Sequence, residues 1–593
     1  MKRGIAMLVF GLGFLLRAGA EGETAGSAEP YFKEVYMSRD AYRPGGRHTG
    51  YPVEQAVPPG PSVYKLKKAD KRRFTPADVL GPDGIVYPNW TRVGVPGGIP
   101  KVPVVVKLVE IGAKPETDIS GLLDKAIEEA AAKGGGAILI DEGTFHLDRP
   151  VIIRKSGVVI RGAGKDKTKL IFRYGLDDPN TKFPGGWPEP GAFVFLGGPL
   201  EESLYLAQDG KRGDTQLTLK EVGGLKAGDT FVLRAECNER WKKFLRTTHR
   251  GEWGSRTCQY EIQSIKGNTI QIGEALRIDY PIEDAAEVRR VTAVRRSGLE
   301  DFTLVHACRM QFHSVSSQWA WECWVRGLNV IDSGKGGAHL SAAKRCEIRD
   351  CEFTGFDAKI HRPHQNWWGY AGFTQSQDCL MDNTVWHRFR HGPQVQFGAQ
   401  GNVIRNSTFD GSDMQWHAGW AAENLFENCV VTYGSHGSYG YGAYATGSDD
   451  GTHGPNGPRN VVYNCRFKSP KDGAFIRGVN ENWIFKHNFF EVGDGAGYRA
   501  EGGSYDAILR DNVFVLGNSQ WPMVMLTTRD CTGTEVIGNT LYGGNGTLVV
   551  TEAPLAADRG NKALKLPSDG TVPARPRADP PSIFEWQKKR RLG

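Results

Sequence analysis

The chain has 593 residues, including 76 glycines, 32 prolines and 15 tryptophans, and its formal net charge is +7. This length is too great for one ordinary globular core and favours a large, turn-rich repeat domain. The tail from 588 to 591 supplies much of the charge, and no basic stripe with interleaved aromatic residues occurs, so we expect no nucleic-acid partner. The remaining charge serves solubility or favours an acidic partner such as a uronate polysaccharide.

The first residues have the pattern of an export signal. Lys2 and Arg3 precede an apolar run from 5 to 16, and the small residues 18–20 follow it as a cleavage site. The run is short for a membrane span, and no other segment is long and apolar enough to cross a bilayer. We therefore expect removal of residues 1–20 and a secreted or periplasmic protein without a membrane span. A retained N-terminal anchor is the alternative.

Residues 21–115 lack a clear period and are expected to form an extended arm along the main domain. A definite pattern begins at Asp118, because Asp118 and Ser120 are residues that cap helices. Apolar residues then recur at helical spacing as far as Ala131, and the glycines at 134–136 end the helix. Short β-runs follow at 137–141, 144–147, 151–155, 157–162 and 169–172.

This order of capping residues, helix, glycines and short strands resembles the opening of the pectate-lyase-like proteins. The resemblance implies an all-β fold, a right-handed parallel β-helix. Residues 116–199 would form its capping helix and its first coils. The resemblance also implies carbohydrate-related function, but it carries over no catalytic motif. One departure is Asp141-Glu142, where the family more often has a proline before the Gly-Thr-aromatic turn.

The pattern changes between residues 200 and 290. Alternating runs at 215–219, 229–237, 260–265 and 268–272 predict a small inserted β-subdomain. Such an insertion either contacts substrate or only covers one face of the coils.

The clearest repeat lies within residues 291–550, which we expect to form the main β-helix. Each copy has an apolar residue, a polar pair, a small or Asn/Cys residue and an aromatic or β-branched residue, and copies recur about every 22 to 24 residues, as in a β-solenoid. Longer gaps after Cys351 and Cys429 predict two loop insertions on one side of the coils. Residues at equivalent positions in successive coils are predicted to be Cys351, Ser407, Cys429, Cys465, Asn488 and Asn512.

Recurrence at one position indicates that the cysteines are mostly free, buried thiols, and the absence of a CxxC pair makes a structural zinc site improbable. Residues 551–593 are Pro-rich and basic, and they are predicted to be a docked or disordered tail.

The strand that precedes the repeat motif varies in polar content. Alternate side chains of a strand point the same way, so Gln394 and Gln396 share a face, as do Asp413, Gln415 and His417. Stacked coils would place these groups side by side, with Arg477, Arg499 or Glu501 on nearby coils. Exposed polar ladders are also ordinary on β-helices.

Five histidines within about sixty residues sharpen this hypothesis: His361, His364, His387, His391 and His417. Histidine suits proton transfer near neutral pH, arginine neutralises carboxylates, and tryptophan offers a platform for sugars. We predict His417 or His391 as the proton-transfer residue and Arg388 or Arg390 as the carboxylate neutraliser. The predicted substrate contacts are Gln394, Gln396, Asp413, Gln415, Trp416, Trp420, His361, His364 and Arg477. Each histidine alone has another explanation, a bond to a loop carbonyl.

Asp449 and Asp450 form a competing signal in a Gly-rich loop that ends at His453-Gly454. Polygalacturonase-like hydrolases of this fold use aspartates with a nearby His-Gly, but the accompanying Asn-Thr-Asp and Arg-Ile-Lys elements are missing here. The loop is instead a candidate Ca²⁺ site, because short carboxylates and backbone carbonyls supply hard oxygen ligands. A surface turn without metal is the alternative.

These patterns together predict an exported, carbohydrate-active β-helix, with a polysaccharide lyase that cleaves a uronate-containing glycan as the first hypothesis. A glycoside hydrolase on the same fold is the second hypothesis and requires two carboxylates at hydrolytic separation. A non-catalytic, glycan-binding β-helix is the third.

Overall fold

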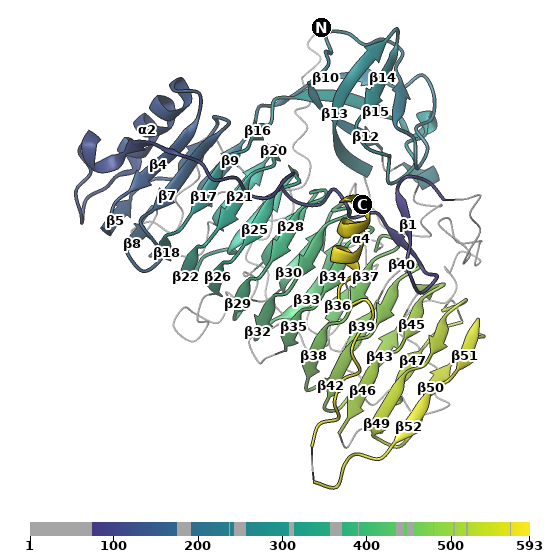
Figure 1. Ribbon diagram of the computed structural model, residues 1–593. Helices are drawn as coiled ribbons and strands as arrows, with labels where there is room; N and C mark the ends of the chain where they lie inside the picture. The colour runs from purple at the N-terminus through teal and green to yellow at the C-terminus, as the bar shows by residue number, and fades with distance from the viewer. Residues whose placement is uncertain are drawn as a thin grey trace, which may run out of the picture. The chain divides into compact units, whose positions relative to one another are not determined.

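The structure is a computed structural model that describes residues 74–174, 191–236, 238–241, 256–307, 313–355, 370–389, 391–433, 444–446, 456–477, 480–501, 504–517, 520–529, 531–569 and 571–592. For residues 370, 417–418, 444–446 and 591–592 only the backbone is described. All described residues belong to the second of two compact units, which spans residues 62–593. This unit is a parallel β-solenoid of about 14 turns, which confirms the predicted right-handed β-helix (Figure 1).

The first sheet of the solenoid has 14 strands, and every strand pairs in parallel with its neighbours in the next coils. Its strands are β3 (Val104–Lys107), β4 (Gly136–Ile140), β7 (Val158–Gly162), β17 (Gly298–Glu300), β21 (Trp324–Arg326), β25 (Glu347–Arg349), β28 (Leu380–Asp382), β31 (Val403–Arg405), β34 (Leu425–Glu427), β37 (Val461–Tyr463), β41 (Ile484–Lys486), β45 (Ile508–Arg510), β48 (Glu535–Ile537) and β51 (Ala557–Arg559).

The second sheet has 13 parallel strands, each separated from the first sheet by a short corner. Its strands are β5 (Gly143–Leu147), β8 (Thr168–Phe172), β18 (Thr303–His306), β22 (Asn329–Ser333), β26 (Glu352–Gly355), β29 (Val385–His387), β32 (Thr408–Asp410), β35 (Val430–Thr432), β38 (Arg466–Ser469), β42 (Phe489–Val492), β46 (Val513–Leu516), β49 (Thr540–Gly543) and β52 (Lys562–Leu564).

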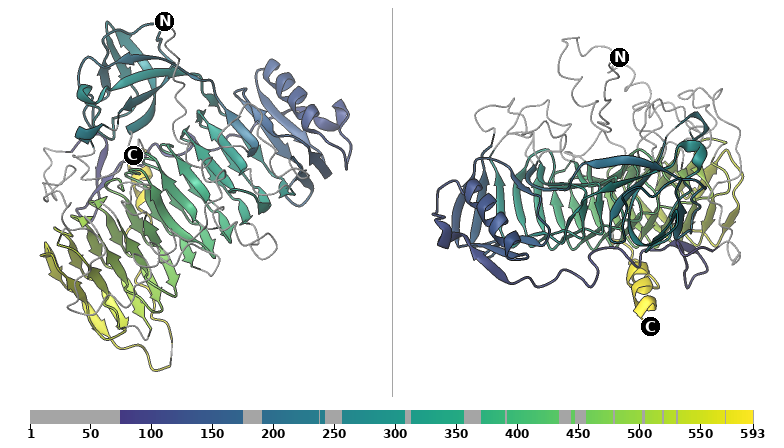
Figure 2. Two further views of the ribbon diagram at one scale, coloured as in Figure 1. Left: turned by 180° about the vertical axis from the view of Figure 1, so that it is seen from behind. Right: turned by 90° about the horizontal axis from the view of Figure 1, so that it is seen from above.

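The third sheet has 12 parallel strands and contains the polar strands singled out from the sequence. Its strands are β6 (Val151–Ile153), β9 (Gly191–Leu196), β19 (His313–Gln318), β23 (Ala338–Ser341), β27 (Tyr370–Thr374), β30 (His391–Gln396), β33 (Asp413–Ala418), β36 (Tyr444–Thr446), β39 (Ala474–Ile476), β43 (Tyr498–Ala500), β47 (Val524–Leu526) and β50 (Val549–Thr551). Figure 2 shows the strands of successive coils stacked in rows.

The predicted equivalence of Cys351, Ser407, Cys429, Cys465, Asn488 and Asn512 is confirmed. Each residue follows a strand of the first sheet by two positions. At the later coils this position is an asparagine ladder, in which the Asn488 backbone N–H donates to Asn512 Oδ1 at 2.9 Å and the Asn512 N–H donates to Asn539 Oδ1 at 3.0 Å. The ladder satisfies corner amides that lie inside the coil, where an unpaired N–H would be destabilising.

A second ladder, not predicted from the sequence, lies just before the strands of the first sheet. The backbone N–H of Asn402 donates to Asn424 Oδ1 at 3.1 Å, and that of Asn424 donates to Asn460 Oδ1 at 2.9 Å. Cysteines occupy the same position in earlier coils. All eight cysteines in the described part of the chain are buried and free, as expected.

Helix α2 (Ser120–Ala132) precedes β4 and buries Leu123, Ile127 and Ala130 in the core of the first coils. The predicted cap differs in detail. Ile119 is the N-cap residue and makes no side-chain cap, whereas Asp118 Oδ1 accepts from the Ser120 N–H at 3.0 Å and from the Asp148 N–H at 3.1 Å. Asp118 therefore ties the start of the helix to the turn after β5.

The predicted insertion is a six-stranded antiparallel sheet with its own apolar core. Its strands are β10 (Leu200–Tyr205), β11 (Gln216–Thr218), β12 (Thr230–Ala235), β13 (Arg256–Lys266), β14 (Thr269–Ile272) and β15 (Glu287–Val291), with the 3-10 helix η8 (Ile282–Asp284) before β15. Small parallel sheets at corners of the coils join β16 (Val294–Arg295), β20 (Ala320–Trp321) and β24 (Ala343–Lys344), and β40 (Asn480–Glu481) with β44 (Ser504–Tyr505).

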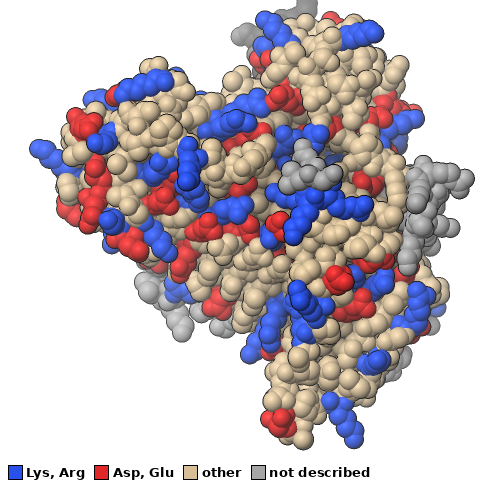
Figure 3. All heavy atoms as spheres, viewed as in Figure 1, with Lys and Arg blue, Asp and Glu red and all other residues tan. Residues whose placement is uncertain are grey.

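The solenoid does not end at residue 550, where the tail was expected to begin. Strands β51 and β52 continue the first and second sheets, so the solenoid extends past 550. The later residues include helix α4 (Ile583–Leu592), whose Ile583 and Phe584 are buried against the outer side of the first sheet. Figure 3 shows a group of Lys and Arg side chains where α4 lies in Figure 1. No helix in the described part of the chain is long and apolar enough to span a membrane.

The described part of the N-terminal arm packs on the same side as α4. It contains the hairpin β1 (Asp78–Leu80) and β2 (Val86–Pro88), and the 3-10 helix η5 (Leu108–Ile111) follows β3. The Trp90 N–H donates to Gln587 Oε1 at 2.8 Å, and Gln587 Nε2 donates to the Pro88 carbonyl at 2.9 Å. The two ends of the described chain are thus joined by hydrogen bonds.

The corner before the first sheet carries alternating charges. In seven successive coils, from β17 to β37, the residue two positions before the strand has a left-handed φ. We call these residues the charged corner column: Arg296, Glu322, Arg345, Asp378, Gly401, Glu423 and Arg459. Neighbouring members attract one another, with 2.9 Å between Arg296 Nε and Glu322 Oε2 and 3.7 Å between Arg459 Nη1 and Glu423 Oε1.

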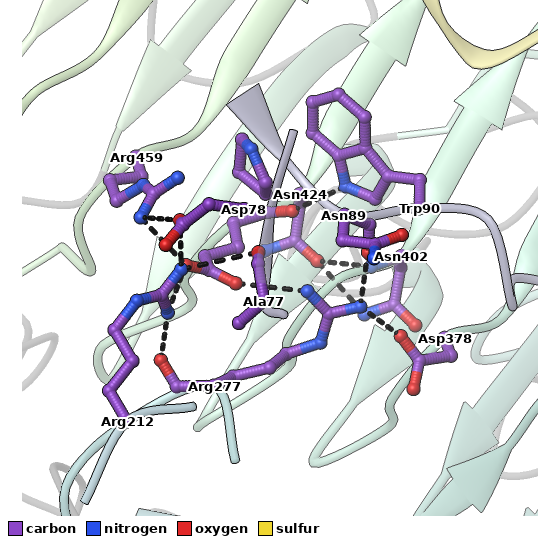
Figure 4. A network of polar contacts seen from close by, with 12 residues as sticks. Ala77, Asp78, Asn89, Trp90, Arg212, Arg277, Asp378, Asn402, Asn424 and Arg459 are labelled. Carbon is purple, nitrogen blue, oxygen red and sulfur yellow. Dashed lines mark hydrogen bonds and ion pairs between the residues drawn. The ribbon is translucent and has the colours of Figure 1, made fainter. Parts of the chain in front are cut away.

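Gly401 interrupts this alternation, and Arg277 of the insertion takes the place of the missing side chain. Figure 4 shows Arg277 directed toward Asp378. A Cβ at Gly401 would overlap the Arg277 guanidinium, which pairs with Asp378 on one side and with Glu423 at 2.9 Å on the other. Asp78 of the arm pairs with Arg459 at 2.6 Å. Burial alone would raise the pKa of Asp78, but Arg459 and Arg212 outweigh burial and hold that pKa well below its usual range. Insertion, arm and coils are therefore fastened by one buried ionic network.

We predict that Arg277→Ala lowers the free energy of unfolding by about 3–5 kcal/mol, because removal of one partner leaves buried charge uncompensated. Asp378 and Glu423 are almost completely buried at this point. The matched control is Arg466→Ala, which removes an exposed arginine 2.7 Å from Glu491 and should cost about 1 kcal/mol or less. Chemical denaturation followed by tryptophan fluorescence measures both; equal effects of the two variants would contradict the assignment.

The docking of α4 predicts a pH dependence of stability. Glu427 is completely buried and accepts hydrogen bonds from Ser582 Oγ at 2.6 Å and from the Ile583 N–H at 2.5 Å. Burial raises the pKa of Glu427 from 4.5 to about 7, although Ser582 and Arg405 oppose the rise. The folded protein therefore binds more protons than the unfolded chain between these pH values, so stability falls as pH rises through this window.

Glu427→Gln should flatten this dependence, since glutamine keeps the acceptor and cannot ionise. The control Glu129→Gln, which changes a surface pair with Lys133, should keep the wild-type slope. The measurement is the melting temperature of each protein from pH 4.5 to 8. If the melting temperature of Glu427→Gln falls with pH as steeply as that of the wild type, Glu427 is not responsible.

Candidate active site

The polar side chains of the third sheet lie on its outer face. Val395 of β30 and Met414 and Trp416 of β33 are part of the solenoid core. Because side chains alternate along a strand, Gln394, Gln396, Asp413 and Gln415 point to the opposite face. The sheet register sets Gln394 beside Gln415.

His391 and Asp413 form a buried pair at the start of β30 and β33. Their Cα positions are register partners, and 2.8 Å separates His391 Nδ1 from Asp413 Oδ1. The side chains are 3% and 0% exposed. Since a carboxylate only accepts hydrogen bonds, the proton of the neutral imidazole lies on Nδ1, which leaves Nε2 as the basic nitrogen. The pair has the geometry of a general base held by an orienting carboxylate.

Asp413 was predicted to contact substrate. In the structure its buried carboxylate is paired with His391, a position from which it orients the imidazole.

Gln394 and Gln415 are buried polar groups with unused hydrogen-bonding capacity. Gln394 is 0% exposed and Gln415 is 2% exposed. Within the described residues, both amide atoms of Gln394 and the Oε1 atom of Gln415 have no hydrogen-bond partner. A buried polar atom without a partner is destabilising by roughly 1–3 kcal/mol, which is a common property of sites that await a polar ligand.

A histidine-rich extension of this face was missed in the sequence. The rings of His313 and His339 are stacked with centroids 4.6 Å apart. His339 Nε2 lies 3.0 Å from Thr374 Oγ1, which also accepts from Gln396 Nε2 at 2.8 Å. The alternating run at 313–318 could have predicted a strand of the third sheet that carries His313, but no complete repeat motif accompanies this run. The structure thus connects Gln396 to two further imidazoles on earlier coils.

The arginines of the later coils form a separate group on the same sheet. Arg477 and Arg499 lie over the Phe475 ring, with centroid distances of 5.4 and 4.7 Å. Arg499 also pairs with Glu501 and lies 3.8 Å from Asp472. Strand β39 is the third neighbour after β30, or about 14 Å away at ordinary strand spacing, so Arg477 does not meet His391 directly.

The two predicted stacking platforms are core residues, which is a correction. Trp416 is 1% exposed and packs on Phe426 with ring centroids 4.4 Å apart. Trp420 is equally buried and contacts Trp241 of the insertion at 5.3 Å. Neither ring presents a face to a sugar.

Other predicted residues are distributed differently. Arg388 lies half-buried in the turn before β30, with φ of 63°. His387 belongs to the second sheet, where it faces Asp410 at 3.4 Å. His361, His364, Arg390, Asp449, Asp450 and the side chain of His417 lie outside the described residues. Within those that are described, no group of three or more His, Cys, Asp or Glu side chains is arranged to hold a metal ion.

The sequence matches no family model and no curated protein. Among solved structures, the tailspike gp61 of Pseudomonas phage phi297 is similar with a TM-score of 0.53 and 13% identity, over 75% of this chain and 70% of that one. The tailspike gp49 of Pseudomonas phage LKA1 also gives 0.53 at 13% identity, over 76% and 83%. At this identity the likeness shows the fold alone, which is a right-handed parallel β-helix.

Proposed function

We propose that this protein is an exported, carbohydrate-active β-helix that cleaves a uronate-containing polysaccharide by β-elimination. The observation that carries the proposal is the buried His391–Asp413 pair on a polar sheet face. Beside it lie the Gln394 amide and the Gln415 Oε1 atom, which have no hydrogen-bond partner among the described residues. The export signal predicted for residues 1–20 would be consistent with an extracellular or periplasmic polymer as substrate.

In β-elimination a base removes the proton from the carbon next to the uronate carboxylate. The electron pair of that C–H bond forms a double bond in the ring and expels the neighbouring glycosidic oxygen, which takes up a proton. His391 Nε2 would accept the first proton, and Asp413 would stabilise the imidazolium that results. His417, on the following coil, stays a second candidate for proton transfer.

The sugar would be oriented by amides, and its carboxylate would be neutralised by a cation. Gln394 and Gln415 supply both donors and acceptors at adjacent register positions. Arg388, in the turn before β30, or Arg390, two residues further along the sequence, would neutralise the carboxylate. Arg477 and Arg499 would contact sugars further along an extended chain, and Ca²⁺ at Asp449 and Asp450 would add positive charge.

Two other functions use the same face. A hydrolase requires two carboxylates at hydrolytic separation. Among the described carboxylates of this face, Asp413 is paired with His391, and Glu501 and Asp472 form ion pairs with Arg499. A glycan-binding β-helix without catalysis would use the amides and Phe475 alone. Assays on acidic and neutral polysaccharides separate the three functions: a new ultraviolet-absorbing double bond with reducing ends indicates a lyase, reducing ends alone a hydrolase, and neither a binding protein.

We predict that His391→Ala lowers kcat by about 10²–10⁴-fold, as expected for loss of a positioned general base, while substrate binding falls far less. Asp413→Asn should also lower kcat, because asparagine no longer holds the imidazole tautomer. The matched control is His387→Ala on the second sheet, a half-buried histidine that also faces an aspartate. Initial rates and melting temperatures are measured together. Near-normal kcat with an unchanged melting temperature for His391→Ala would refute the assignment of His391.

A further inference from the structure

A cavity lies between the insertion, the arm and the early coils, away from the outer face of the third sheet. Its volume is about 400 Å³. This falls within the range of about 300–1,000 Å³ that is common for small-molecule sites. The coils contribute Arg296, Glu322 and Arg345, which are three successive members of the charged corner column.

The insertion meets the corner column differently along its length. Further along the column, Arg277 enters the place beside Gly401 and pairs with Asp378 and Glu423. At the earlier corners Arg296, Glu322 and Arg345 carry their own side chains, and the insertion contributes Glu261, Gln263 and Glu274 to the lining of the cavity.

Cations outnumber anions in the lining. Four arginines, at 92, 295, 296 and 345, face three glutamates, at 261, 274 and 322. Arg345 is loosely held, at 3.4 Å from Glu274 and 3.8 Å from Glu322, and its buried Nε has no hydrogen-bond partner in the described part of the chain. Arg296 pairs with Glu322, but its side chain is 65% exposed. Arg92 donates to the Gly273 carbonyl and Arg295 pairs with Glu261. Arg345 Nε is therefore the unused donor of this lining within the described residues, and most of the Arg296 side chain is open to solvent.

Trp321 also lines the cavity, and the Arg295 guanidinium lies over the indole ring at 5.2 Å from the centroid. Gln263 adds a neutral amide to the lining. Trp321 itself is 1% exposed, so it supports Arg295 and presents no ring face to a ligand. Planar arginines bind oxyanions in a bidentate way, and the Gln263 amide can donate to and accept from sugar hydroxyls.

We propose that this cavity is a second saccharide-binding site, which takes a sugar bearing an oxyanion, either a carboxylate or a sulfate ester. Arg345 and Arg296 bind the oxyanion, and Gln263 contacts the sugar ring. That the sugar belongs to the same polysaccharide that is cleaved on the third sheet rests on the proposed function. The site itself does not.

The test measures binding of small probes by saturation-transfer NMR and thermal shift. Glucuronate and glucose 6-sulfate are the probes, and glucose is the uncharged control. We expect at least one charged probe to bind the wild-type protein and glucose to bind far more weakly. Binding of glucuronate alone assigns a carboxylate ligand, and binding of glucose 6-sulfate alone assigns a sulfate.

Arg345→Ala should weaken probe binding by about tenfold or more, in line with the loss of a charge-assisted hydrogen bond. Arg296→Ala, which removes a mostly exposed side chain, keeps the test valid if Arg345→Ala fails to fold. Arg466→Ala is the surface control and should leave probe binding unchanged.

Failure of this inference is separable from failure of the proposed function. Probe binding that is absent, or that is equal in wild type, Arg345→Ala and Arg296→Ala, overturns the second site even if polysaccharide is cleaved. Arginine-dependent probe binding supports the site even if no polysaccharide is cleaved.

Discussion

The parallel hydrogen bonding between successive coils is the constraint on which the other features of this protein depend. Each coil contributes one residue to each position of the register, so a chemical group repeated at the coil period becomes a continuous column. A slip of one residue would turn every core side chain outward and every polar one inward. The asparagine ladder through Asn488 and Asn512 opposes such a slip, because it bonds the corner of one coil to the next.

The same register makes columns with different functions. The charged corner column holds the insertion and the arm through buried ion pairs, and Gly401 is the place where the column accepts Arg277 from outside. On the outer face of the third sheet the column is polar and contains the His391–Asp413 pair. The buried ion pairs that stabilise the fold and the proposed catalytic pair therefore lie on different corners and faces of one repeating scaffold.

The sequence predicted the features that are local. The repeat motif is contiguous, so the positions of Cys351 and Asn488 followed directly, whereas the ladder through Asn402 and Asn424 lies in a segment without a regular motif. The inward position of Trp416 could have been predicted from the sequence. The alternation that placed Gln415 outward also places Trp416 inward, where the core needs a large apolar side chain. The pairing of His391 with Asp413 required the register between two strands, including its irregularity after His391, and single-strand patterns do not contain it.

The proposed activity depends most on binding of the glycan to the outer face of the third sheet, over β30 and β33. The most direct measurement is a crystal structure of the His391→Ala variant with the acidic oligosaccharide that the protein binds. We expect a sugar hydrogen-bonded to Gln394 and Gln415, with the carbon next to its carboxylate facing the position of the missing imidazole. An oligosaccharide seated on the second sheet, or on the later coils without contact to β30, would contradict it.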